Sequence, residues 1–84
     1  MDRDVLEQHL RDAEERVARG LEHIARQREI IRGLDLKGPD LAAAQELLAT
    51  LEEMQKAHEA DRDEIARNLS ARTRAGNHGA GNAG

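Results

Sequence analysis

The residues best suited to chemistry in this chain are one imidazole and two carboxylates. His58 and Asp61 are three residues apart and would share a helix face, and an antiparallel partner helix would bring Glu14 close to them. Imidazole and carboxylate groups bind metal ions, and helical bundles hold such ions through Glu-x-x-His motifs. Neither His9 nor His23 has a Glu three residues before it. The spacing therefore matches a metal site only in part, and we expect no bound cofactor.

A polar layer is the favoured interpretation of the same region. Gln55, His58 and Arg62 occupy positions of an apolar stripe, where polar side chains fix the register and the oligomeric state of packed helices. Arg62 would pair with a nearby carboxylate. A pH-responsive or phosphotransfer role for His58 is the alternative, although a phosphotransfer histidine must be exposed to solvent.

Catalysis and nucleic-acid binding have little support in the sequence. Cysteine is absent, and the only hydroxyl side chains are those of Thr50, Ser70 and Thr73. No nucleophile–base pair results, so we expect no enzyme. The basic residues near the end of the chain are Arg67, Arg72, Arg74 and His78. They lie on a chain of net charge −4 without aromatic residues, so we expect no nucleic-acid partner.

Two apolar stripes, separated by Gly38-Pro39-Asp40, must position all of these side chains. The first stripe comprises Leu6, Leu10, Ala13, Val17, Gly20, Ile24, Gln27, Ile31 and Leu34. The second comprises Leu41, Ala44, Leu48, Leu51, Gln55, His58, Arg62, Ile65 and Leu69. Both advance in alternating steps of three and four, which is typical of packed helices. In an antiparallel arrangement the two residue numbers of every layer sum to 75, so the pattern predicts an all-α, antiparallel two-helix hairpin of the coiled-coil type.

We expect one hairpin domain over residues 1–71, with a helix over about 3–36, a turn at 37–40, a helix over about 41–71, and a flexible tail at 72–84 that is rich in Gly, Asn and Ala. Asp2 or Asp4 is suited to begin the first helix. Gly38 is preferred to Gly33 as its end, because Leu34 would complete the stripe and Pro39 follows at once.

The composition provides only a thin hydrophobic core. Leu, Ile and Val supply 16 of the 84 residues, and aromatic residues are absent. A two-helix hairpin with so few large side chains is marginal alone, which predicts self-association or docking on a partner. No signal peptide or apolar membrane span is visible, so we expect a cytoplasmic protein with no membrane partner. The excess of Arg over Lys and the abundant Ala suggest a bacterial source.

The two flanks of the stripes predict where a partner would bind. The register predicts that Arg16 lies beside Glu59 and His23 beside Glu52 on one flank, and that Leu21 lies beside Met54 and Arg28 beside Leu47 on the other. The predicted partner-facing residues are Leu21, Ile30, Leu47 and Met54. An apolar strip beside a complete stripe is typical of bundles of more than two helices, so we expect a C2 homodimer that forms a four-helix bundle.

Three segments resemble short, uncharacterised bacterial helical-hairpin proteins. They are HIARQREI at His23–Ile30, LLAT at Leu47–Thr50 and HEADRD at His58–Asp63, and the resemblance covers about residues 13–69. It implies an autonomous bacterial hairpin and brings no activity, cofactor or ligand with it.

The sequence therefore predicts a small, non-enzymatic helical module whose function is assembly or protein interaction through a self-complementary apolar surface. The alternative is a regulatory adaptor that docks on a larger helical signalling or transcription protein, and a metal-binding bundle is the third interpretation.

Overall fold

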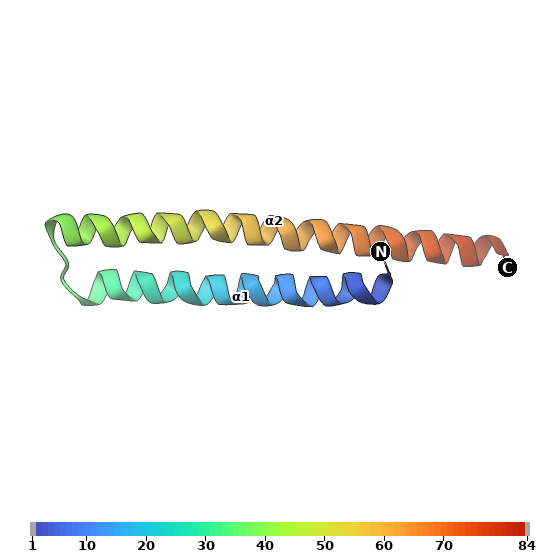
Figure 1. The fold of residues 1–84 in the computed structure, drawn as a ribbon, viewed down its shortest axis with the longest axis horizontal. Helices are drawn as coiled ribbons and strands as arrows, with labels where there is room; N and C mark the ends of the chain where they lie inside the picture. Colours follow the sequence, from blue (N-terminus) through green and yellow to red (C-terminus); the bar gives the residue numbers. More distant parts are fainter. Residues whose placement is uncertain (1, 84) are drawn as a thin grey trace.

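The computed structural model describes residues 2–83, with side chains described as far as residue 74. Two helices, α1 (Arg3–Gly33) and α2 (Gly38–Ala83), run antiparallel and pack along one another, as Figure 1 shows. The molecule is a rod of 68 × 17 × 14 Å. The predicted all-α helical hairpin is confirmed. No described helix is both long and apolar enough to cross a membrane.

The first helix begins where the acidic cap was expected and ends earlier than expected. The Asp2 side chain accepts a hydrogen bond from the Asp4 backbone N–H at 3.4 Å, as an N-cap residue does. Leu34 is the C-cap, and its N–H donates to the Ile30 carbonyl at 3.1 Å. The predicted end at residue 36 is therefore wrong, because the helix stops at Gly33.

The early end removes Leu34 from the stripe. Leu34 is 63% exposed, so it does not form the predicted last layer with Leu41. The next residue, Asp35, has a φ of 46°, the left-handed conformation that commonly terminates a helix. The chain thus turns at residues 34–37 rather than at 37–40.

The second helix begins at Gly38, whose positive φ of 55° is accessible to glycine without a steric penalty. Pro39 follows in the first turn, where its missing N–H is not needed, and Asp40 favours the positive end of the helix. The helix continues to Ala83, past the predicted end near residue 71. Extending an existing helix costs far less than nucleating one, and alanine is the best helix former.

The buried residues follow the predicted stripes. In α1 they are Leu6, Ala13, Val17, Ile24 and Gln27. In α2 Gln55 is buried, and the other stripe residues are partly buried. The core is therefore one row of layers between two helices, and its buried members in the described part of the chain are four hydrophobic residues and two glutamines.

Candidate interaction surface

The central layer of the hairpin places Gln55 against Gly20. Gln55 is 5% exposed, and its Nε2 donates a hydrogen bond to the Val17 carbonyl of the opposite helix at 2.9 Å. A Cβ added at Gly20 would overlap Gln55 Oε1 and would lie 2.8 Å from Gln55 Cδ. The absence of a side chain at residue 20 therefore creates the space that the glutamine fills. This contact confirms the predicted pairing of residues 20 and 55.

A second glutamine crosses the interface in the other direction. Gln27 of α1 is 7% exposed, and its Nε2 donates to the Ala44 carbonyl of α2 at 2.9 Å. Each helix thus sends one amide to a backbone carbonyl of its partner. The sequence indicated both residues as stripe members, but only Gln55 as part of a polar layer.

The other two residues of the predicted polar layer, His58 and Arg62, are partly buried. Arg62 pairs with a nearby carboxylate, as expected, and the partner is its neighbour Asp63 at 2.9 Å. Among the side chains that the structure describes, no group of three or more His, Asp and Glu residues is arranged to hold a metal ion. The structure therefore does not bring Glu14, His58 and Asp61 together as a metal site.

The flank assignment is wrong. Arg28 forms an ion pair with Glu52, with 3.0 Å between Nη2 and Oε2, whereas it was expected beside Leu47. Met54 lines a groove together with Arg16 and His23, whereas it was expected beside Leu21.

The reversal of chain direction explains the error. In each helix, residues one step after a stripe position lie on one side of the stripe, and residues one step before it lie on the other. Because the two helices face each other and run in opposite directions, residues of the same kind lie on the same flank of the hairpin. Residues just before the stripe in one helix therefore meet residues just before it in the other. His23 and Met54 are such residues, while Arg28 and Glu52 both follow stripe positions.

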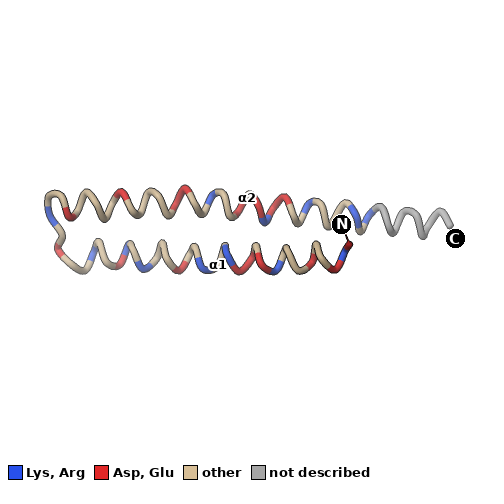
Figure 2. Tube along the Cα trace, viewed as in Figure 1, with Lys and Arg blue, Asp and Glu red and all other residues tan. Residues whose placement is uncertain are grey.

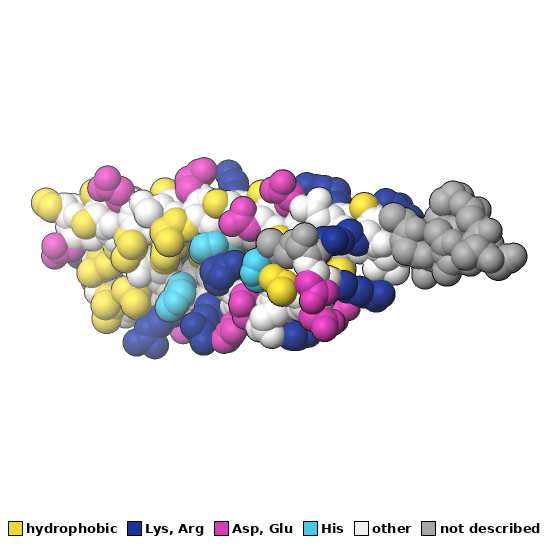
Figure 3. All heavy atoms as spheres, turned by 45° about the vertical axis from the view of Figure 1, so that its right-hand side comes forward, with side chains coloured by type: hydrophobic (Ala, Val, Ile, Leu, Met, Phe, Trp, Pro, Cys, Tyr) yellow, Lys and Arg dark blue, Asp and Glu magenta, His cyan; other side chains and the backbone are white. Residues whose placement is uncertain are grey.

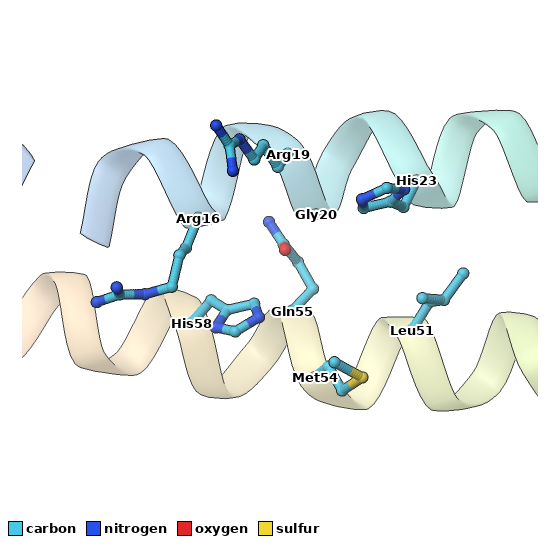
Figure 4. Close-up of a pocket in the computed structure, with 8 residues that line it drawn as sticks. All are labelled: Arg16, Arg19, Gly20, His23, Leu51, Met54, Gln55 and His58. Atoms are coloured by element: carbon cyan, nitrogen blue, oxygen red, sulfur yellow. The ribbon is translucent and has the colours of Figure 1, made fainter. Parts of the chain in front are cut away.

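The flank that contains Met54 is hollowed into a groove of about 220 Å³. Figure 4 shows the eight residues that line it: Arg16, Arg19, Gly20 and His23 from α1, and Leu51, Met54, Gln55 and His58 from α2. The amide of Gln55 reaches across toward Gly20. Its Oε1 is buried and has no hydrogen-bond partner in the described structure. The groove therefore combines two apolar side chains, those of Leu51 and Met54, with five that contain nitrogen.

The predicted partner-facing residues divide between the two flanks. Ile30 lies seven residues after His23, and Leu47 seven before Met54, so these residues share the groove flank. Leu21 lies seven residues before Arg28 and so belongs to the flank of the ion pair with Glu52. The strip that was expected to contain all four residues is thus two separate apolar surfaces.

The apolar side chains of the groove flank lie between the middle of the hairpin and the turn. Leu47 is 49% exposed and Met54 is 50% exposed, while Ile30 is partly buried. Figure 2 shows that α2 carries few charges in its first turns, and Figure 3 shows hydrophobic side chains gathered at the turn end, with histidines and basic side chains next to them. The arrangement is suited to binding another protein surface.

No protein-family model matches the sequence, and no similar protein was found among curated proteins or among solved structures.

Proposed function

We propose that this chain is a non-enzymatic helical assembly module that associates with further copies of itself. The observation that carries the proposal is the contrast between the core and the surface. Four hydrophobic residues are buried between the helices, whereas Leu21, Leu47 and Met54 are each about half exposed. Covering them would contribute about 25 cal/mol for each Å² of apolar area removed from water.

The energetics of a hairpin of two helices support the same proposal. Each helix can bury only the face that meets its partner, and a small core rarely provides more than about 3–5 kcal/mol. The cross-helix ion pair of Arg28 and Glu52 is about half exposed on both sides, so it adds at most about 1 kcal/mol. Further copies would supply the missing apolar contacts.

Sedimentation equilibrium of the full chain over a wide concentration range tests this function. We expect the apparent mass to rise above the 9.3 kDa of one chain at micromolar concentrations. A well-folded monomer throughout that range would contradict the proposal. If such a monomer captured a different helical protein and lost it in the Leu21→Glu variant, the adaptor interpretation would replace this one.

A further inference from the structure

The hairpin carries two surfaces of opposite character on its two flanks. We propose that these surfaces bind each other between copies of the chain, so that Leu21 of one copy enters the groove beside Met54 of the next. This inference rests on the proposed self-association and specifies its geometry. The two surfaces are named here the acidic flank and the basic groove.

The acidic flank surrounds an exposed leucine with carboxylates. Leu21 is 54% exposed. Arg28, one heptad further along α1, reaches Glu52 of α2 at 3.0 Å, which places Glu52 on this side of the hairpin. By the same seven-residue spacing Glu14 precedes Leu21 and Glu59 follows Glu52 on this flank. Lys56, which lies between Glu52 and Glu59 along α2, pairs with Glu53 at 3.2 Å. Three glutamates therefore surround an apolar side chain, and the two basic residues beside them, Arg28 and Lys56, are each paired with a glutamate.

The basic groove has the complementary character. Its apolar part is formed by Leu51 and Met54, and its rim carries the side chains of Arg16, Arg19, His23 and His58. Two acidic residues reduce this positive charge. Glu15 forms an ion pair with Arg19, and Asp61 lies on the same flank, seven residues after Met54. The groove measures about 220 Å³, so it is large enough to admit one aliphatic side chain.

Charge decides which surfaces meet. In a two-fold symmetric contact centred on the groove, Arg16 and Arg19 of one copy would lie near the same arginines of the other. In one centred on Leu21, the glutamates of the two copies would lie near each other, so like charges would repel in both cases. Contact between the acidic flank and the basic groove brings opposite charges together around a buried leucine. Because the two surfaces lie on opposite flanks, one copy can bind a neighbour on each side. Such a head-to-tail contact leaves one free surface at each end, onto which further copies stack in a series.

Sedimentation velocity of four full-length samples tests this arrangement: the wild type, Leu21→Gln, Met54→Glu, and an equimolar mixture of the two variants. The wild type is expected to form a concentration-dependent series of sizes that shrinks as salt is added. Each variant alone is expected to bind at least about 10-fold more weakly, because it lacks one of the two surfaces. The mixture is expected to yield one species of two chains, since one variant keeps the groove and the other keeps Leu21.

The matched control is Val5→Gln, which replaces an apolar residue that is 41% exposed, does not line the groove and lies two heptads from its nearest α1 counterpart, Arg19. It is expected to associate as the wild type does. A wild type that forms a closed dimer which Leu21→Gln leaves unchanged would overturn this inference and leave the proposed function standing. A mixture that stays monomeric while the wild type associates would also overturn it, whereas a monomeric wild type would contradict the proposed function itself.

Discussion

Gln27 and Gln55 are two glutamines buried in the same helix–helix interface, but their surroundings differ. Both donate from Nε2 to a backbone carbonyl of the other helix at 2.9 Å. Gln55 faces a glycine and leaves its Oε1 buried without a hydrogen-bond partner, whereas Gln27 falls in the layer that the register assigns to Leu48. The two glutamines thus make similar hydrogen bonds in different layers. Gln55 packs tightly against Gly20 and leaves one polar atom without a partner, whereas Gln27 lies in a layer with a leucine.

The difference indicates that the two layers have different roles. The pair of Gly20 and Gln55 is specific, because few other combinations fill that space, and a shift of the helices would bury the amide against a larger residue. Such polar layers stabilise one register at some cost in stability. Gln27 does not require a glycine in the opposite helix, so the register depends mainly on the layer at residue 55.

The largest effect is expected from breaking the apolar layer between the two glutamines. Ile24 is 6% exposed and pairs with Leu51 in the layer between them. Ile24→Ala should lower the free energy of unfolding by about 2–4 kcal/mol, because it leaves a cavity beside two buried amides. Chemical denaturation followed by circular dichroism measures the change. Leu34→Ala is the control, because Leu34 is 63% exposed, and an equal loss there would contradict the assigned core.

A double-mutant cycle at residues 20 and 55 would sharpen the comparison. With Gln55 present, Gly20→Ala should gain little, because the new Cβ displaces the amide and its hydrogen bond to Val17. In the Gln55→Ala background the same change should stabilise the helix by about 1 kcal/mol. Denaturation of the four proteins should therefore give a coupling energy of about 1–2 kcal/mol.

The matched glycine for this cycle is Gly33, at which an added Cβ would meet no atom within 4 Å. Gly33→Ala should have the same effect whichever residue occupies position 55. Equal effects of Gly20→Ala in both backgrounds would show that the tight fit has no energetic consequence.

Replacing each glutamine with leucine compares the two amides directly. Gln55→Leu removes a buried oxygen that has no partner, and the Val17 carbonyl keeps its place in the helical hydrogen-bond ladder. We expect Gln55→Leu to stabilise the hairpin by about 1 kcal/mol more than Gln27→Leu does. Thermal unfolding of both variants at one low concentration checks this order, and a larger gain for Gln27→Leu would reverse our interpretation of the two layers.

The smallest effect is expected at the turn, far from both layers. Asp35 has a φ of 46°, which glycine adopts more easily, so Asp35→Gly should stabilise the chain by about 0.5–1 kcal/mol. The gain should add to that of Gln55→Leu, since distant sites act independently. Lys37→Gly is the control, because its φ is not positive and added freedom in the unfolded chain should slightly destabilise it. A gain for Lys37→Gly equal to that for Asp35→Gly would argue against strain at Asp35.

The sequence was sufficient for the buried layers, was wrong for the last layer at Leu34, and was insufficient for the flanks. The alternation of threes and fours determines which residues meet, and it correctly paired Gly20 with Gln55. It does not show how side chains cross the interface, because the bonds from both amides to backbone carbonyls depend on side-chain torsions. The end of α1 was also ambiguous, since Gly33 and Gly38 are both acceptable terminators and only the conformation of Asp35 decides between them.

The candidate surface was misplaced for a geometric reason. Leu21 and Met54 are exposed as expected, but they were assigned to one flank when the reversal of direction puts them on two. That correction changes the assembly that we propose from a closed pair to a series.

The slenderness of the rod, 68 Å long and 17 × 14 Å across, has a consequence for how the chain opens. Each layer touches only the layers next to it, so breaking one weakens its neighbours and leaves distant ones intact. We expect the helices to separate first at the two ends of the paired region, at the turn and at the open end, and last in its middle. Amide hydrogens around Ala13 to Gln27 should therefore exchange with solvent most slowly, and those near both ends of the paired region most rapidly.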